Sequence, residues 1–302
     1  MKKKNNILIV GGTGFIGYHL ANKCIQKNWK VTSVSAHQPK KKRFNKKIEY
    51  LICDITKKND IKKKIGDNFD YLVNLGGYVD HSNKKKTYQS HYIGVKNLAK
   101  FFLFKNLKSF VQLGSGGEYA DCESPHKETN KGSPVSTYYR SKLLATLHLK
   151  KLFQKKKFPA TILRLYQAYG PRQDVNRLIP IVIKNCLQNK KFDCSEGKQF
   201  RDFVYIDDVV NNILKTLKNK NSKGKIFNVG SGKPIKVKKL IETINNKIKK
   251  GYPQYGKIKL RKDEKIKVFP SINRSKKILK WQPKISIQSG LTKTIQYYKK
   301  ND

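Results

Sequence analysis

Short apolar runs alternate with longer amphipathic stretches through the first half of the chain. The runs have the length of β-strands and lie at residues 7–10, 31–35, 50–52, 71–75, 110–113 and 161–165. After the first run, apolar residues at positions 15, 16, 20, 21, 24 and 25 recur with the spacing of one helix face. Strands that alternate with helices of this length predict an α/β protein with a parallel, doubly wound sheet.

The pattern changes after Pro171, where the regular alternation ends. The later residues predict helices over 177–188, 206–218 and 236–249 and a short strand over 226–229. We therefore expect a sheet domain over residues 1–165 and a smaller, mixed α/β domain over residues 166–302. Residues 200–219 are expected to return to the sheet domain.

A glycine-rich turn, Gly11-Gly12-Thr13-Gly14-Phe15-Ile16-Gly17, joins the first predicted strand to the first predicted helix. The missing side chains let the backbone approach a dinucleotide pyrophosphate, and the N–H groups of the first helical turn then face its negative charge. A flexible turn is the other interpretation of a glycine run. With a strand before it and a helix after it, the turn predicts a Rossmann-type dinucleotide-binding fold.

The formal net charge of +47 raises the possibility of a nucleic-acid surface. However, only eight of the 67 basic residues are arginines, and lysines occur in almost every segment without interleaved aromatic residues. We therefore expect solvated lysine-rich faces and no specific nucleic-acid partner. An arginine in such a chain is expected to do what lysine cannot, such as bind a diphosphate with two hydrogen bonds.

Hydropathy and cysteine usage limit the class of protein further. No run of eighteen apolar residues occurs, and the first residues, Met1-Lys2-Lys3-Lys4, lead into a strand rather than a signal peptide. The five cysteines are scattered and form no Cys-x-x-Cys pair. We expect a soluble, cytoplasmic protein with no metal site, no disulfide framework and no membrane partner.

Tyr138 and Lys142 are the strongest candidates for acid-base chemistry. They stand four residues apart, on one face of a predicted helix. A tyrosine titrates near pH 10, so a cation one helical turn away favours its phenolate. Ser115 leaves the carboxyl end of the preceding predicted strand, the edge at which ligands bind such sheets.

Together these motifs resemble the extended short-chain dehydrogenases/reductases, the NAD(P)-dependent nucleotide-sugar epimerase, dehydratase and reductase family. The resemblance covers nearly the whole chain. It is carried by residues 11–17, Asp54-Ile55, Asn74-Leu75-Gly76-Gly77, Ser115 with Tyr138 and Lys142, and the segments 163–171, 200–208, 227–232 and 279–283.

The resemblance implies a role for each matching residue. Tyr138 would be the general acid/base, Lys142 would lower its pKa and hold the nicotinamide ribose, and Ser115 would hydrogen-bond the reacting oxygen. The implied cofactor-binding residues are Gly11, Thr13, Gly14, Phe15, Ile16, Gly17, Ser35, Asp54, Ile55, Leu75, Gly76, Gly77, Tyr138, Lys142 and Tyr166. The implied residues for a nucleotide-diphosphate sugar are Ser115, Gly116, Gln167, Arg177, Arg201 and Arg261. Arg201 has an alternative role, an ion pair with Asp202 or Asp208.

Three departures from the family pattern narrow the expected activity. Gly116-Gly117 follows Ser115 where dehydratases carry an Asp-Glu pair, so a dehydratase is not expected. His91 and Gln167 each stand where relatives carry asparagine. The second predicted strand ends at Ser35 without an acid that would accept the ribose 2′-OH of NAD, which favours NADP over NAD.

The sequence favours a nucleotide-sugar oxidoreductase that transfers a hydride to C4 of a 4-keto-6-deoxyhexose nucleotide. A 4-epimerase of the UDP-glucose 4-epimerase type is the alternative within the family. A non-catalytic dinucleotide-sensing module is the alternative of another class, and the retained Ser115, Tyr138 and Lys142 disfavour it. Relatives dimerise through helices that correspond to residues 81–106 and 137–156, so the resemblance also implies a homodimer.

Overall fold

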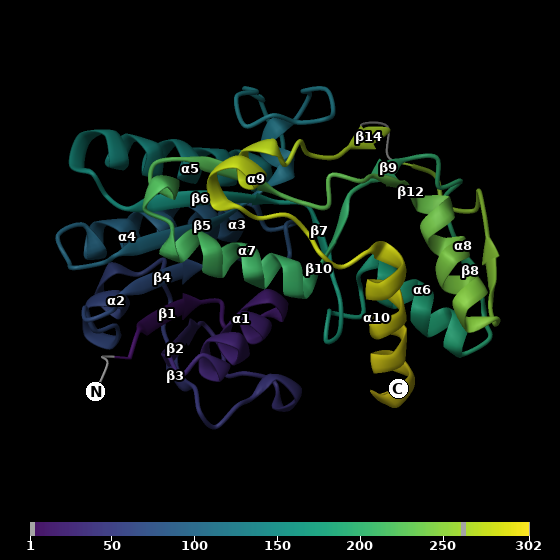
Figure 1. Ribbon diagram of the computed structural model, residues 1–302, viewed down its shortest axis with the longest axis horizontal. Coiled ribbons are helices and arrows are strands. Elements are labelled where there is room, and N and C mark those ends of the chain that lie inside the picture. The colour runs from purple at the N-terminus through teal and green to yellow at the C-terminus, as the bar shows by residue number, and fades with distance from the viewer. Residues whose placement is uncertain (1–3, 261–263, 302) are drawn as a thin grey trace.

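A parallel sheet of seven strands forms the centre of the computed structural model, which describes residues 4–260 and 264–301 (Figure 1). The strand order is β11-β6-β5-β4-β1-β2-β3, and each neighbouring pair is parallel. The strands are β1 (Asn6–Val10), β2 (Lys30–Ser35), β3 (Glu49–Ile52), β4 (Tyr71–Asn74), β5 (Ser109–Ser115), β6 (Ala160–Leu165) and β11 (Ile226–Val229). The predicted fold class, a Rossmann-type doubly wound sheet, is confirmed.

The continuous apolar character of β1 follows from burial on both faces of the sheet. Ile7 and Ile9 join one hydrophobic cluster, whereas Leu8 and Val10 join another. Successive side chains of a strand point to opposite faces, so each face of β1 contributes to a separate core.

Helices cover both faces of the sheet. The cluster of Ile7 includes apolar residues of α1 (Phe15–Gln26) and α7 (Ile206–Lys218). The cluster of Leu8 includes those of α2 (Lys58–Lys64), α4 (Gly94–Phe102) and α5 (Thr137–Lys156). Before α4 lie α3 (Lys84–Tyr88) and a π-helical turn over Gln89–Ile93. The expected single helix over 81–106 is therefore shorter at both ends and is interrupted by this turn.

A smaller group of elements lies beside the sheet, on the right in Figure 1. Its helices are α6 (Leu178–Leu187), α8 (Val237–Ile248) and α10 (Ile287–Asn301), and α9 (Asn273–Leu279) lies against β11. Its short strands pair as β7 (Gln167–Tyr169) with β10 (Phe203–Tyr205), β8 (Lys191–Asp193) with β13 (Tyr252–Gln254), and β9 (Phe200–Arg201) with β12 (Ile235–Lys236) and β14 (Lys267–Val268).

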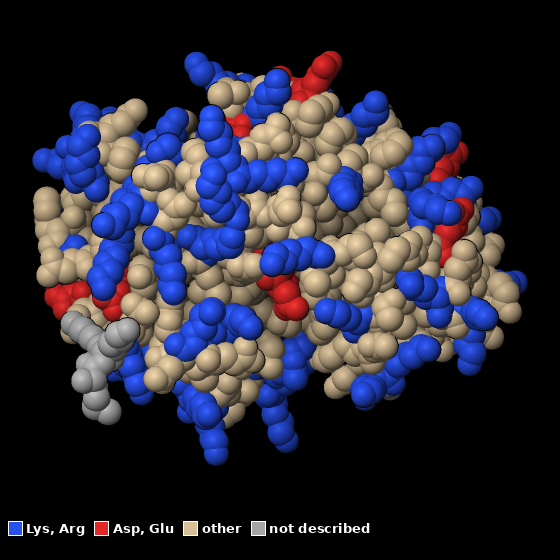
Figure 2. Space-filling model, in the orientation of Figure 1, with Lys and Arg blue, Asp and Glu red and all other residues tan. Residues whose placement is uncertain are grey.

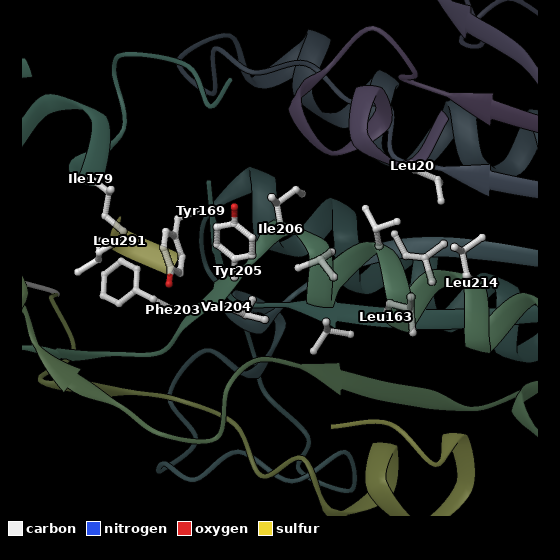
Figure 3. Close-up of a cluster of buried hydrophobic side chains, with 14 of the residues drawn as sticks. Leu20, Leu163, Tyr169, Ile179, Phe203, Val204, Tyr205, Ile206, Leu214 and Leu291 are labelled. Atoms are coloured by element: carbon white, nitrogen blue, oxygen red, sulfur yellow. The ribbon is translucent and has the colours of Figure 1, made fainter. Parts of the chain in front are cut away.

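One hydrophobic cluster connects the two groups of elements. Leu20 and Leu163 of the sheet layers belong to the same cluster as Ile179 and Leu291 of the smaller group. Figure 3 shows the chain of contacts, with Tyr169, Phe203 and Tyr205 between α7 and α10. The division at residue 165 remains a prediction, and both α7 and β11 from the later part pack into the sheet layers.

Lysines and arginines are spread over the whole visible face of the molecule in Figure 2. This distribution agrees with solvated faces rather than with one basic stripe. Among residues 4–260 and 264–301, no helix is long and apolar enough to cross a membrane.

A buried carboxylate attaches the C-terminal segment to α7. Asp208, 3% exposed, accepts hydrogen bonds from the backbone N–H groups of Lys284 (3.0 Å) and Ile285 (2.9 Å). Its own carbonyl accepts one from the indole of Trp281 at 3.1 Å. The first turn of a helix also favours this negative charge.

We expect Asp208→Ala to lower the free energy of unfolding by about 2–4 kcal/mol, because it leaves two backbone donors without their carboxylate. Urea unfolding measures the loss. The matched control is Asp207→Ala, since Asp207 is exposed in the same helical turn. Equal stability losses in both variants would contradict this account.

Candidate active site

The glycine turn brings two strand ends into close contact. Gly11 follows β1 with φ +77°, and a Cβ atom on it would lie 2.8 Å from the backbone nitrogen of Gly76, which follows β4. A Cβ on Gly17 would lie 2.3 Å from the carbonyl oxygen of Gly11. Gly14 caps α1 without a side-chain hydrogen bond, so no side chain of the cap occupies the first N–H groups of α1. This cradle fits the pyrophosphate of a dinucleotide.

Hydroxyl and guanidinium groups lie at the rim of the glycine turn, next to the end of β2. The Thr13 hydroxyl donates to the Ser35 hydroxyl at 2.9 Å. Arg43, 5% exposed, donates to the carbonyl of Thr13 (3.4 Å) and to the carboxylate of Asp174 (2.9 Å). The neighbouring lysines 40–42 are exposed.

The residues after β3 and β4 line the same edge of the sheet. Asp54 accepts hydrogen bonds from the N–H (2.9 Å) and hydroxyl (2.8 Å) of Thr56. The carbonyl of Ile55 accepts one from Asn97 at 3.1 Å. Leu75 donates its N–H to the carbonyl of Val10 at 2.9 Å. Thus the segments predicted to bind cofactor meet beside the glycine turn, with Phe15 and Ile16 opening α1.

Ser115, Tyr138 and Lys142 come together between the end of β5 and the start of α5. Lys142, 4% exposed, donates to the carbonyl of Leu113 at 2.7 Å, and its Nζ lies 5.9 Å from the centre of the Tyr138 ring. The Ser115 hydroxyl accepts the backbone N–H of Gly117 at 3.1 Å, and Ser115 opposes the rise of the Tyr138 pKa.

Burial dominates the titration of this pair. It raises the pKa of Tyr138 to about 12, with Tyr139 and Glu118 acting in the same direction and Arg177 and Ser115 opposing. Burial also lowers the pKa of Lys142 to about 8, opposed by Glu118. The phenol is therefore protonated at neutral pH, and the lowering of its pKa by Lys142 that the resemblance implies stays a prediction.

Two histidines enclose the Tyr138 ring. His81 stacks on it, with ring centres 3.9 Å apart and planes 15° apart, and His91 meets it edge-on at 4.8 Å. The His91 Nε2 lies 3.1 Å from the carbonyl of Tyr78, and a Cβ on Gly77 would lie 1.9 Å from its Cε1. His91, which stands where relatives carry asparagine, therefore leaves no room for a side chain at position 77.

Two tyrosine rings explain the glycine pair after Ser115. A Cβ on Gly116 would lie 2.8 Å from the Cζ atom of Tyr166, and one on Gly117 would lie 2.0 Å from Cε1 of Tyr139. An Asp-Glu pair of the dehydratase kind has no room here. Tyr166 is held by His126, whose Nδ1 lies 2.7 Å from the phenol oxygen.

The remaining residues predicted to bind substrate that the structure describes are spread over several elements of the smaller group. Arg177 is exposed just before α6, and its charge acts on Tyr138 and His81. Gln167 is exposed in β7. Arg201, in β9, pairs with Glu264 and donates to the carbonyl of Phe200 at 2.7 Å. Arg261 lies outside the described residues.

The alternative partners suggested for Arg201 are wrong. Asp202 accepts hydrogen bonds from Ser231 and Gly232, and Asp208 accepts them from residues 284 and 285. Asp202 lies between β9 and β10, and its carboxylate is used by the loop over 231–232 rather than by Arg201.

Comparison with known proteins agrees with this geometry. A family model described as the NAD dependent epimerase/dehydratase family matches residues 7–230. The chain belongs to this NAD-dependent epimerase/dehydratase family.

Relatives of this epimerase/dehydratase chain extend over its whole length. A putative UDP-glucose 4-epimerase of Methanocaldococcus jannaschii is 28% identical over 98% of this chain and 99% of its own. CDP-abequose synthase of Salmonella muenchen is 28% identical over 96% of each chain. The UDP-glucose 4-epimerase of Thermotoga maritima, solved with UDP-glucose, superposes with a TM-score of 0.90 at 25% identity, over 98% of this chain and 99% of its own.

Membership of the epimerase/dehydratase family identifies the chain as an NAD-dependent enzyme and disfavours the non-catalytic module. Sequence reasoning missed two residues near Tyr138. Glu118 has a local signal, since Ser115-x-x-Glu118 is a capping box, and the structure contains it. His81 reaches Tyr138 through the fold of its loop, and no sequence spacing predicts that contact.

The lowered pKa of Lys142 predicts a pH-dependent stability. The folded protein holds this lysine with a pKa of about 8, below the value of 10.5 usual for the side chain. The cation therefore destabilises the fold below pH 8, by roughly 3 kcal/mol at about 1.4 kcal/mol for each pKa unit. As the pH rises from 8 to 10.5, this cost disappears, because the unfolded state binds the proton more tightly.

We expect Lys142→Met to unfold at a higher urea concentration than the wild type at pH 7, and the difference to shrink between pH 8 and 10. The control, Lys151→Met, changes an exposed lysine of the same helix and should follow the wild type at each pH. A constant difference between Lys142→Met and the wild type would contradict the buried-cation assignment.

Proposed function

We propose that the chain reduces the 4-keto group of a 4-keto-6-deoxyhexose nucleotide. The observation that carries this proposal is a partly buried, protonated Tyr138 phenol beside Ser115, with the Lys142 ammonium 5.9 Å from the centre of its ring. Because the phenol carries its proton at neutral pH, it can donate that proton to a carbonyl oxygen that becomes an alkoxide. The likeness to CDP-abequose synthase over 96% of each chain supports a nucleotide-sugar reductase.

A nicotinamide cofactor, when bound, would supply the hydride for C4 of the sugar. The backbone of Gly11, Gly14, Gly17, Gly76 and Gly77 would hold the dinucleotide, and Lys142 would hold the nicotinamide ribose. Asp54 and Ile55 would flank the adenine. The other cofactor-binding residues would be Thr13, Phe15, Ile16, Leu75 and Tyr166.

Ser115 and Tyr138 position the sugar oxygen by donating hydrogen bonds to it. As negative charge grows on that oxygen, these bonds strengthen, so they stabilise the transition state more than the ground state. Tyr138 then transfers its proton to the oxygen and is left as a phenolate, which the Lys142 ammonium stabilises. Gly116, Gln167 and Arg177 contact the substrate, and Arg201 and Arg261 bind its diphosphate.

A 4-epimerase is the second candidate, because the likeness to the Thermotoga maritima enzyme favours it. Such an enzyme oxidises C4 and reduces it again, so the same three residues serve both reactions. Cofactor stoichiometry separates them. A reductase consumes one NADPH for each 4-keto nucleotide sugar, whereas an epimerase isomerises a UDP-hexose with no net change in cofactor.

We propose NADP as the preferred cofactor. Ser35, at the end of β2, contributes a hydroxyl where a carboxylate would repel a 2′-phosphate, and lysines 40–42 lie close in sequence. We also propose a homodimer formed through α4 and α5, since the large side chains of Phe104, in the turn after α4, and of Leu147, in α5, are 83% and 52% exposed. The protein is proposed to act in the cytoplasm.

Replacing Tyr138 tests the proton donor. We expect Tyr138→Phe to lower kcat for NADPH-dependent reduction by at least about 100-fold, because the substitution removes the hydroxyl that donates the proton. Tyr252→Phe is the control, since Tyr252 is 54% exposed in β13. Unchanged turnover in Tyr138→Phe would remove Tyr138 from the mechanism.

Introducing an acid at the end of β2 tests the cofactor. We expect Ser35→Asp to weaken NADPH binding by about tenfold or more relative to NADH, through repulsion of the 2′-phosphate. Nicotinamide fluorescence titration gives both dissociation constants, and NADH serves as the internal reference. An unchanged ratio would mean that Ser35 does not face the 2′ position.

A further inference from the structure

The fully buried carboxylate of Glu118 lies next to the candidate active site, three residues after Ser115. Glu118 belongs to the short 3₁₀ turn over Gly116–Tyr119, after β5, and its exposed fraction is 0%. An ionised carboxylate is stable in such a place only when charges or donors surround its oxygens. Both oxygens of Glu118 are occupied.

The two oxygens connect three different elements of the site. One accepts the backbone N–H of Ser115 at 2.8 Å. The other accepts the hydroxyl of Thr146 in α5 at 2.8 Å and the Nε–H of Arg164 in β6 at 3.0 Å. Since Thr146 follows Lys142 by one helical turn, Glu118 links the turn that carries Ser115 to the helix face that carries Lys142.

Arg164 is buried as deeply as its partner. Its side chain is 4% exposed, and its guanidinium lies 4.3 Å from the centre of the Tyr119 ring. The Tyr119 hydroxyl in turn donates to Asn228 of β11 at 2.7 Å. A planar guanidinium can stack on a ring and donate sideways at once, which a lysine cannot do.

A buried ion pair of this kind is a poor source of stability, because desolvation of the two charges offsets their attraction. Stability alone therefore does not explain why the Glu118–Arg164 ion pair is buried beside the candidate active site. Glu118 raises the pKa of Lys142 against the effect of burial. It is also the acidic group whose charge acts on Tyr138.

We propose that Glu118 is a positioning residue for the reaction, which fixes Ser115 against α5 and places a buried negative charge at the helix face that carries Lys142. Arg164 and Thr146 hold its carboxylate in place from the side away from Ser115. The expected effect of Glu118 on catalysis rests on the proposed function. Its expected effect on the protonation of Lys142 does not depend on which sugar is bound.

Glu118→Gln tests the inference, because the amide keeps the size and one acceptor oxygen but removes the charge. The double variant Glu118→Gln with Arg164→Met also removes the partner charge. No unpaired guanidinium then remains buried, so the double variant avoids the loss of stability that such a charge would cause. Glu196→Gln is the matched control, since Glu196 is 58% exposed and pairs with Lys198. Urea unfolding establishes that each protein is folded.

The decisive measurement is the pH dependence of NADH and NADPH binding between pH 6 and 9.5, followed by nicotinamide fluorescence. We expect the alkaline loss of affinity to move to lower pH by about one unit or more in Glu118→Gln, because Lys142 loses its proton earlier. The double variant should show a smaller shift in the same direction. Other groups that face Tyr138 and Lys142, namely His81, His91, Tyr139 and Arg177, are the same in all four proteins.

Turnover gives the second measurement. With a 4-keto nucleotide sugar, the loss of kcat in Glu118→Gln should be roughly fivefold larger at pH 8.5 than at pH 6.5, as a Lys142 pKa lowered by about one unit requires. A loss of equal size at every pH, with an unchanged alkaline midpoint for cofactor binding, would show a merely structural role and overturn the inference. If no nucleotide sugar is reduced by the wild type, the proposed function fails, while the binding profile still decides the role of Glu118.

Discussion

Parallel hydrogen bonding among β1, β4, β5 and β6 brings four strand ends to one edge of the sheet. Val10 pairs with Asn74, and Asn74 pairs with Gln112. The buried amide of Asn74 donates to the Gln112 side chain at 2.9 Å, while its oxygen accepts the N–H of Gly76 at 3.1 Å. This polar contact sets the direction in which the chain leaves β4, and the glycine turn and Ser115 depend on the same alignment.

Much of this architecture could be predicted because it is local in sequence. Apolar runs predict the strands, and the predicted helix over 206–218 coincides with α7. Tyr138 and Lys142 share a helix face because of their spacing, so one turn of α5 brings them together. Ser115 joins them because parallel strands end at one edge.

The remaining features depend on contacts between distant segments. His81 reaches Tyr138 from another loop, and Arg201 finds Glu264 rather than its sequence neighbour. The expected helix over 81–106 contains a π-helical turn at Gln89–Ile93, which periodicity does not reveal. The sequence also led us to expect that arginines in this chain do what lysines cannot, such as bind a diphosphate. Arg43 and Arg164 are both buried against carboxylates, whereas the expectation concerned a diphosphate.

The glycine pair after Ser115 also bears on how this site could change during evolution. The Tyr166 and Tyr139 rings fill the space that side chains at Gly116 and Gly117 would need. Any single substitution at these positions meets an aromatic ring before it can contribute a new acid or base. Tyr139 is 38% exposed, so its ring can move aside for a side chain at position 117, whereas Tyr166 is 8% exposed and hydrogen-bonded to His126. Position 116 is therefore the more restricted of the two, and a side chain gained there would require a change at Tyr166 as well.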